Sequence, residues 1–194
     1  MNDIKKVINS VNPRTIWEVG AGNPSISRLR PYFNTEIKLS MFEPNPSTFK
    51  SLKEAFGNVK NLEIFNFGLY DRNDTVDFLD EDDSTSMVGI DSPTKILGGG
   101  RFGLEWLENK KKTKMQIRDI SEIDTGDIDV ALIDTEGCEW KIISKMLSRP
   151  KFLSIETHNE IYRTPDLDKL TAWLGDNNYS YLGCSETDSW YIKL

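Results

Sequence analysis

Two short stretches of the sequence carry residue types that bind a nucleoside cofactor. Gly20 and Gly22 follow a short apolar strand that ends at Val19, and glycine, lacking Cβ, turns tightly and lets a ligand approach the backbone. Glu43 closes a second strand about twenty residues further on. In a parallel α/β sheet this acid lies beside the glycine turn, where its carboxylate can accept hydrogen bonds from both hydroxyls of a ribose. We therefore predict a nucleoside-cofactor site.

The residues after the glycine pair distinguish two classes of cofactor. Nicotinamide dinucleotides favour a glycine at the sixth position of the turn, which packs the helix closely and presents its N-terminus to the pyrophosphate. Here Ser25 holds that position and Pro24 precedes it. Proline removes one backbone N–H and stiffens the turn, so the sequence favours S-adenosylmethionine, which has no pyrophosphate. An NAD-dependent oxidoreductase is the alternative that shares this half of the pattern.

Acidic side chains and the only histidine of the chain follow the ends of two further strands. The segment 129–134 is the most apolar strand, as expected at the centre of a covered sheet, and it ends at Asp134. The strand 152–156 ends at Glu156, with His158 just beyond it. Ligands bind α/β sheets at the carboxyl ends of parallel strands. We therefore expect these three side chains at a catalytic edge, with His158 as general base.

The same three side chains allow a second mechanism. Two carboxylates and an imidazole, from Asp134, Glu156 and His158, form a suitable ligand set for a divalent metal that lowers the pKa of an acceptor hydroxyl. We hold this metal site as the minority alternative. His158 as an incidental exposed side chain is the structural alternative to both mechanisms.

The composition is that of one soluble globular domain. The chain has 194 residues, with 38% hydrophobic and 28% charged residues, enough for a single buried core. The net charge of −7, from 31 acids and 24 bases, disfavours a nucleic-acid partner. No apolar run approaches the roughly 18 residues of a membrane span, and no secretory signal begins the chain, so we expect no membrane partner and a cytoplasmic location. Cys138 and Cys184 have neither metal nor disulfide spacing, which predicts reduced thiols.

Hydrophobic periodicity predicts the elements that position these residues. The first expected helices are 2–11; a short helix at 25–33 with Ile26 and Leu29 inward, which Pro31 should end or bend; and 46–56 capped by Asn45. Two more follow: one opened by 134–139 with Trp140, Ile143 and Leu147 on one side and Pro150 as its stop, and one capped by Thr164 and carrying Leu167, Leu170 and Leu174. The expected strands are 16–19, 37–42, 62–67, 75–79, 115–123, 129–134, 152–156 and a terminal hairpin within 179–194. Between residues 80 and 114 periodicity is weak, which predicts an insertion, a lid or a substrate loop in an otherwise single domain of 1–194.

Five motifs in chain order resemble one family. They are Glu18-Val-Gly-Ala-Gly-Asn, Phe42-Glu-Pro-Asn-Pro, the segment 84–87, Ile133-Asp-Thr-Glu-Gly-Cys-Glu and Ser154-Ile-Glu-Thr-His. Together they resemble the FkbM-type S-adenosylmethionine-dependent methyltransferases over about residues 14–182. The resemblance implies a class I methyltransferase fold, a Rossmann-like doubly wound α/β sheet that is mostly parallel with an antiparallel C-terminal hairpin. It also implies methylation of an oxygen on a small molecule or sugar. The chain departs from the family at Pro24, Pro31 and 89–112.

The resemblance also implies roles for individual residues. It makes Glu18, Gly20, Ala21 and Gly22 the cradle of the methionine end of the cofactor, Glu43 the ribose acid, Pro44, Phe67 and Gly68 the flanks of adenine, and Asp134 the junction of cofactor and acceptor. Structural alternatives stand beside these roles, because Glu18 can cap a helix, Phe67 can fill the core and Asp134 can cap the helix that follows. A non-catalytic module that keeps the cofactor cradle is a further alternative. The sequence predicts no oligomeric state.

Overall fold

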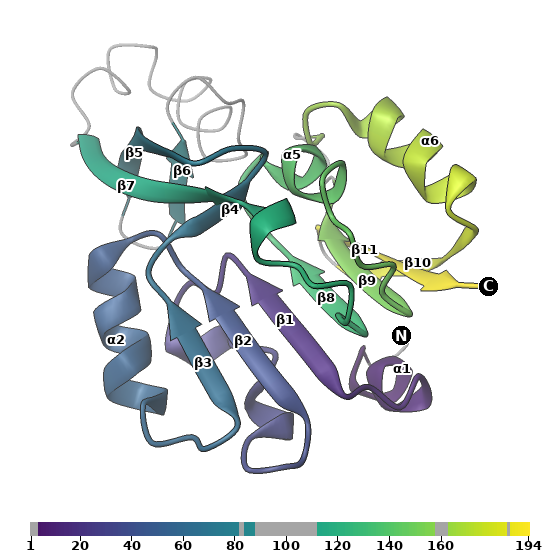
Figure 1. The fold of residues 1–194 in the computed structure, drawn as a ribbon, viewed down its shortest axis with the longest axis horizontal. Helices are drawn as coiled ribbons and strands as arrows, with labels where there is room; N and C mark the ends of the chain where they lie inside the picture. Colours follow the sequence, from purple (N-terminus) through teal and green to yellow (C-terminus); the bar gives the residue numbers. More distant parts are fainter. Residues whose placement is uncertain (1–3, 82–83, 88–111, 158–162, 186) are drawn as a thin grey trace.

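A seven-stranded sheet forms the centre of the molecule (Figure 1). The computed structural model describes residues 4–81, 84–87, 112–157, 163–185 and 187–194. The strands lie in the order β10 (Tyr179–Ser185), β11 (Asp188–Lys193), β9 (Phe152–Glu156), β8 (Val130–Ile133), β1 (Thr15–Val19), β2 (Lys38–Phe42) and β3 (Leu62–Phe65). The strands from β9 to β3 are parallel, whereas β11 runs antiparallel to both β9 and β10. The predicted mostly parallel sheet with an antiparallel terminal hairpin is therefore confirmed.

Alternate residues of each central strand face two separate cores. In β1, Ile16 packs into one core and Trp17 into the other, as the period of two in a strand requires. Both faces of β8 are fully buried, in agreement with its apolar sequence. The α-helices of the described residues are α1 (Ile4–Ser10), α2 (Pro46–Phe56), α5 (Glu139–Ile143) and α6 (Leu167–Asp176). Side chains of α1 and α2 belong to the core with Ile16, and those of α5 and α6 to the core with Trp17, so the sheet is covered on both faces.

The helix α2 begins and ends as the sequence predicts. Asn45 accepts hydrogen bonds from Ser47 N and Thr48 N, which satisfies two of the free amides at the helix N-terminus. Pro46 stands at the first helical position, where its missing N–H costs nothing. Leu52 and Phe56 are buried, so α2 is anchored to the sheet directly after Glu43.

The predicted helix over 25–33 is wrong. Two short 3₁₀ turns, η1 (Pro24–Ile26) and η2 (Arg30–Tyr32), replace it. Each turn has a proline in its first positions, and Pro31 removes the amide that a continuous helix would bond to the carbonyl of Ser27. Leu29 is buried as expected, but Ile26 is 70% exposed instead of inward.

The two C-terminal helices also differ from the prediction. The helix α5 has only 5 residues and ends at Ile143, so Leu147 lies beyond it and is 58% exposed. The helix α6 has Asp166 at its N-cap position, with φ +59° and no side-chain cap. The predicted cap Thr164 is buried and instead donates a hydrogen bond to Glu139.

A second sheet lies beyond the arrowheads of β1, β2 and β3 in Figure 1. Its order is β4 (Gly68–Tyr70), β7 (Lys112–Asp119), β5 (Asp74–Glu81) and β6 (Ser84–Met87). The predicted antiparallel excursion at 75–79 is the centre of β5, which pairs antiparallel with β7 and β6. Of the predicted insertion, 82–83 and 88–111 lie outside the described residues. Its role as a lid and the single-domain organisation remain predictions.

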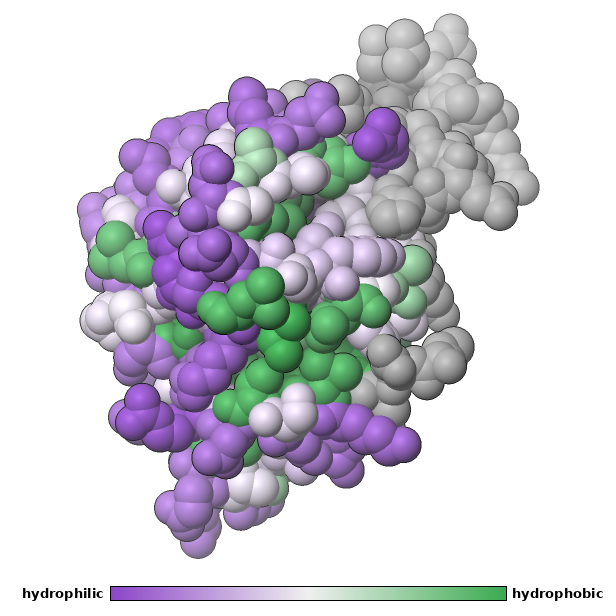
Figure 2. Space-filling view, turned by 90° about the vertical axis from the view of Figure 1, so that its right-hand side faces the viewer, coloured by the Kyte–Doolittle hydropathy of each residue, from purple (hydrophilic) through white to green (hydrophobic). Residues whose placement is uncertain are grey.

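The face on the side of α6 and the terminal hairpin shows a cluster of hydrophobic side chains within a hydrophilic surface (Figure 2). Among large apolar side chains, Tyr181 is 57% exposed and Leu182 is 37% exposed. Both lie on β10, an edge strand of the central sheet. Within the described residues, no helix has the length and hydrophobicity needed to cross a bilayer.

Candidate cofactor and active site

Glu43 follows β2 and is held by a backbone amide on each of its oxygens. Gly22 N donates to Glu43 Oε2 at 2.9 Å, and Asn45 N donates to Oε1 at 2.8 Å. Burial raises the pKa of Glu43, although the two backbone bonds offset part of that rise. Each carboxylate oxygen can accept a further hydrogen bond. The carboxylate is therefore fixed in place and keeps acceptor capacity for a ligand.

The glycine turn packs directly against the end of β8. Gly20 N and Ala21 N both donate to Phe42 O, at 3.0 and 3.1 Å. Gly20 has φ +78°, and a Cβ at this position would stand 1.7 Å from the carbonyl oxygen of Asp134. Because only glycine fits this contact without a backbone shift, the turn brings the ends of β1, β2 and β8 together at one point.

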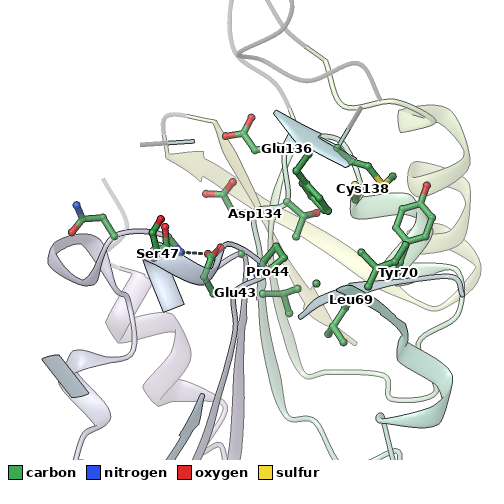
Figure 3. Close-up of a pocket in the computed structure, with 18 of the residues that line it drawn as sticks. Glu43, Pro44, Ser47, Leu69, Tyr70, Asp134, Glu136 and Cys138 are labelled. Carbon is green, nitrogen blue, oxygen red and sulfur yellow. Dashed lines mark hydrogen bonds between the residues drawn. The ribbon is translucent and has the colours of Figure 1, made fainter. Parts of the chain in front are cut away.

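A cavity of 560 Å³ opens at this junction (Figure 3). Six of the predicted site residues line it: Gly20, Gly22, Glu43, Pro44, Gly68 and Asp134. The structure thus brings together residues from the ends of three parallel strands and from β4.

The cavity has an acidic side and a less polar side. Figure 3 shows the carboxylates of Glu43 and Asp134 on one side, with Leu69 and Cys138 across from them. The second sheet contributes further apolar lining residues that the sequence analysis did not select: Tyr70, Phe78, Met87 and Ile117. On the opposite wall, α2 contributes Ser47, Thr48 and Ser51, whose small hydroxyl side chains lie along its first turns. Ser51 lies four residues after Ser47 and three after Thr48, which places the three side chains on one side of the helix. This spacing is the sequence signal that could have identified them.

Phe67 and Glu156 are not among the residues that line this cavity in the described part of the chain. The Phe67 ring packs against the rings of Phe42 and Phe65, and the Arg118 guanidinium lies 4.7 Å from its centroid. The geometry thus matches the structural alternative for Phe67, a core aromatic at the edge of the sheet. His158 lies outside the described residues.

A second cavity, of 230 Å³, adjoins the first and shares Gly20, Ile26 and Asp134 with it. Its walls include Glu18 and Ala21, which the sequence assigns to the cofactor, and also Arg28 and Asp188. Glu18 Oε1 accepts from Arg28 N at 2.9 Å and from Arg28 Nε at 3.5 Å, and Glu18 Oε2 accepts from Ser27 Oγ at 2.8 Å. Arg28 Nη1 donates to Asp188 Oδ2. Arg28 is therefore the cation that links the glycine-turn segment to the terminal hairpin.

Asp134 and Glu156 follow or end the neighbouring parallel strands β8 and β9. Burial raises the pKa of Asp134 to about 6, and the Arg28 guanidinium opposes the rise. Burial also raises the pKa of Glu156 to about 10, with the negative charge of Asp134 adding to the effect. Glu156 is 5% exposed, and its Oε2 has no hydrogen-bond partner in the structure that is described. At pH 7 Glu156 is therefore neutral, whereas most of Asp134 is ionised.

Glu139, on the first turn of α5, shapes the loop that follows Asp134. Its Oε1 accepts from Thr135 N and Gly137 N, each at 3.1 Å, and its Oε2 accepts from Thr164 Oγ1. Glu139 is fully buried, so these bonds stabilise a loop in which Glu136 takes φ +54°. The carboxylate of Glu139 thus has a structural role in forming one wall of the cavity.

The alternative metal site combines Asp134 and Glu156 with His158. Among the residues whose positions the structure describes, no group of three or more His, Cys, Asp or Glu side chains is arranged to hold a metal ion. Because His158 is outside those residues, the three-ligand alternative remains a prediction.

The fold and the cavity define a class of protein: an α/β protein with a cavity at the carboxyl ends of its parallel strands, where this class binds its ligands, beside a glycine turn and an acid. Comparison with family sequence patterns matches residues 18–181 to the methyltransferase FkbM domain. The chain therefore belongs to the FkbM methyltransferase domain family, and the resemblance stated from its motifs is confirmed.

Two solved structures are similar to this chain. A precorrin-6y C5,15-methyltransferase from Geobacter metallireducens GS-15 has 14% sequence identity and a TM-score of 0.46, and the match covers 97% of this chain and 85% of that one. A putative caffeoyl-CoA O-methyltransferase from Staphylococcus aureus has 12% identity and a TM-score of 0.47, covering 98% of this chain and 81% of that one. The search of curated proteins found no match.

Proposed function

We propose that this protein is an S-adenosylmethionine-dependent methyltransferase that binds its cofactor in the 560 Å³ cavity and methylates an oxygen of a small molecule or carbohydrate. The observation that carries the proposal is the Glu43 carboxylate, fixed by Gly22 N and Asn45 N at the wall of a cavity that also contains Asp134. Membership of the FkbM methyltransferase domain family supports the same reading. The free cysteines Cys138 and Cys184 support the cytoplasm as its location.

Each part of the cofactor has a set of residues that suits it. Glu43 would accept the two ribose hydroxyls, since its oxygens keep free acceptor capacity. Pro44 and Gly68 would flank adenine, because both line the cavity that Glu43 also lines. The apolar side chains Phe78 and Met87 would exclude water from the remaining space.

The bound cofactor supplies a methyl group on a positively charged sulfur. The protein's part is to hold an acceptor oxygen in line with that methyl group, which contributes up to roughly 7–11 kcal/mol in the best intramolecular reactions. A positioned base that takes the hydroxyl proton adds about 10²–10⁴-fold. Asp134 is the base we favour, because it lines both cavities and is ionised at pH 7. His158 is the second candidate. Glu156 is neutral at pH 7 and lines neither cavity in the described part of the chain, so it is not a candidate base.

Calorimetric titration of the purified protein with S-adenosylhomocysteine and with NAD tests the cofactor class. S-Adenosylhomocysteine is expected to bind more tightly, because Ser25 and Pro24 replace the features that receive a pyrophosphate. Tighter binding of NAD would contradict the proposal. Release of S-adenosylhomocysteine from S-adenosylmethionine in the presence of hydroxylated acceptors then tests turnover, and binding without any turnover would favour a non-catalytic module.

A further inference from the structure

The 560 Å³ cavity has one wall without charged side chains. Six residues of one hydrophobic core form this apolar wall, and each is at most 6% exposed: Leu69, Tyr70, Phe78, Met87, Ile117 and Cys138. Phe78 and Met87 stand directly opposite each other on the antiparallel strands β5 and β6, so their side chains share one face of the second sheet. Burial raises the pKa of the Cys138 thiol, which is therefore neutral as well. A ligand group against the apolar wall thus contacts uncharged, mostly hydrocarbon surface.

The ionisable side chains of the same cavity are acids. Three carboxyl groups line it, from Glu43, Asp134 and Glu136, and the described residues around it include no lysine, arginine or histidine. Most of Asp134 is ionised at pH 7, as its pKa of about 6 requires. A phosphate or carboxylate on an acceptor would be repelled by this charge and would find no cation of this cavity to pair with. The cavity therefore disfavours an anionic acceptor.

The hydroxyl groups of the lining lie at the cofactor end. Ser47, Thr48 and Ser51 belong to α2, which begins three residues after Glu43. In the view of Figure 3, Ser47 lies beside Glu43 on one side of Asp134, whereas Tyr70 and Cys138 lie on the other side. In the proposed binding mode these hydroxyls face the nucleoside. An acceptor beyond Asp134 contacts the apolar wall instead.

This arrangement selects the class of acceptor. We infer that the acceptor is an uncharged hydroxyl compound with an apolar body, which packs on the apolar wall and presents its hydroxyl to Asp134. A sugar in this place would leave several hydroxyls without hydrogen-bond partners, which is costly in a buried site. The acceptor oxygen takes the methyl group from the sulfonium, leaving a neutral thioether, and its proton passes to Asp134. The inference rests on the proposed function, because it requires the nucleoside to occupy the Glu43 end.

A series of three probes tests the inference on the unaltered protein saturated with S-adenosylhomocysteine. 2-Naphthol is an apolar ring system with one hydroxyl, 2-naphthyl phosphate carries an anion on the same rings, and methyl α-glucopyranoside is uncharged with several hydroxyls. Calorimetry is expected to show 2-naphthol binding at least tenfold more tightly than either of the others, a difference of about 1.4 kcal/mol. Equal or tighter binding of the phosphate or the glucoside would overturn the inference.

Two further outcomes of this titration separate the inference from the proposed function. Absence of 2-naphthol binding would also overturn the inference, because a wall that packs against the acceptor body should also pack against these rings. Failure of S-adenosylhomocysteine itself to bind would instead contradict the proposed function. Tight S-adenosylhomocysteine binding with a preference for the glucoside would leave the methyltransferase proposal intact and point to a carbohydrate acceptor.

Variants of Met87 then assign the preference to the apolar wall. Met87→Lys is expected to weaken 2-naphthol roughly tenfold and to strengthen 2-naphthyl phosphate, because it places a cation on the wall. Met87→Leu conserves volume and polarity and should bind both probes like the original protein. Leu182→Lys is the matched control, since it adds the same charge on the edge strand β10, outside the cavity. Unchanged 2-naphthol affinity in Met87→Lys, or an equal loss in Leu182→Lys, would overturn the inference.

A lysine at position 87 is costly for the fold, because the Met87 side chain is only 6% exposed. Retained binding of S-adenosylhomocysteine shows that a variant is folded. If Met87→Lys loses it, Met87→Ala removes the apolar contact without adding a charge, and it is expected to weaken 2-naphthol severalfold. The probe series on the unaltered protein decides the inference without any variant.

Discussion

Glu43 reaches the cavity with each oxygen already bonded to a backbone amide, so its orientation is set before a ligand arrives. We expect Glu43→Ala to weaken S-adenosylhomocysteine at least tenfold, because charge-assisted bonds to two hydroxyls contribute about 1.5–3 kcal/mol each at most. Calorimetry measures this change. Glu63→Ala, on the exposed side of the next strand, is the control and should leave Kd unchanged.

The amide variant Glu43→Gln refines the same test. Glutamine keeps one acceptor oxygen, but its NH₂ group would face an N–H donor from Gly22 or Asn45. An affinity between those of the original protein and Glu43→Ala is therefore expected. If Glu43→Ala and Glu43→Gln both bind like the original protein, the ribose site lies elsewhere.

Asp134 is expected to take the acceptor proton. Asp134→Asn should lower kcat about 10²–10⁴-fold at saturating cofactor. With the original protein, kcat should fall as pH decreases through about 6, because protonation of Asp134 removes the base. His158→Ala provides the decisive comparison, since an imidazole titrates in a similar range. A large loss in His158→Ala together with a normal rate in Asp134→Asn would assign the base to His158.

Glu156 is expected to reduce the stability of the fold as pH rises. Its pKa is raised from 4.5 to about 10. Between pH 7 and 9, Glu156 is therefore ionised in the unfolded chain but protonated in the folded protein. The free energy of unfolding should therefore fall with increasing pH, by up to about 1.4 kcal/mol per pH unit from this one group. Glu156→Gln resembles the neutral acid and should show a flatter dependence.

Urea unfolding of both proteins at pH 7, 8 and 9 measures that difference. Other titrating groups contribute equally to the two proteins and cancel in the comparison. Asp134 adds little, because its pKa of about 6 leaves it mostly ionised in the folded and unfolded states above pH 7. Identical slopes for the original protein and Glu156→Gln would mean that Glu156 is already ionised in the folded protein.

At the scale of elements, the contact between the glycine turn and β8 should be the least tolerant of change. Gly20→Ala places a Cβ 1.7 Å from the Asp134 carbonyl oxygen at φ +78°. Gly126→Ala has a similar φ of +87° with nothing within 4 Å, so it isolates the backbone strain of about 1–2 kcal/mol. We expect Gly20→Ala to lower the unfolding free energy well beyond Gly126→Ala. Thermal or urea melts measure both losses of unfolding free energy. Equal losses in the two variants would mean that the end of β8 shifts to accommodate the added Cβ.

The elements that the sequence predicts well have local signals. Asn45 and Pro46 mark the start of α2, the apolar run before Asp134 marks a central strand, and the aromatic-rich C-terminal segment marks the hairpin. In each of these elements, the helix cap, the hydrophobic period or the apolar run that predicts it lies within a few residues of the element itself. Gly20, Gly22 and Glu43 were predictable for the same reason, since they follow closely on the ends of β1 and β2.

The elements predicted wrongly depend on contacts that local periodicity does not contain. Ile26 and Leu29 have helical spacing, but Pro31 interrupts the helix that this spacing predicts, two 3₁₀ turns form instead, and Ile26 is left exposed. Thr164 resembles a helix cap, yet its hydroxyl serves Glu139 across 25 residues. Arg28 and Asp188 are 160 residues apart, so no pattern in either neighbourhood could place them in one cavity.

At the scale of the whole molecule, the central sheet joins two halves of the chain through one pair of strands. β2 and β3 lie on one side of β1, and β8, β9 and the terminal hairpin lie on the other. The N-terminal half supplies the glycine turn and Glu43 to the cavities, whereas the C-terminal half supplies Asp134 and Asp188. The proposed active site is therefore completed at the junction between β1 and β8.

That junction also sets an order of events while the chain is being synthesised. β1 pairs with β8 in the register Ile16 to Val130, so one edge of β1 has no neighbour until more than half of the chain has been made. An uncovered edge strand is a template for pairing with other chains. The Asp134 carbonyl that closes on Gly20 arrives at the end of β8. A ribosome-bound chain that stops short of residue 134 would thus carry the glycine turn and Glu43 without the backbone that packs against them.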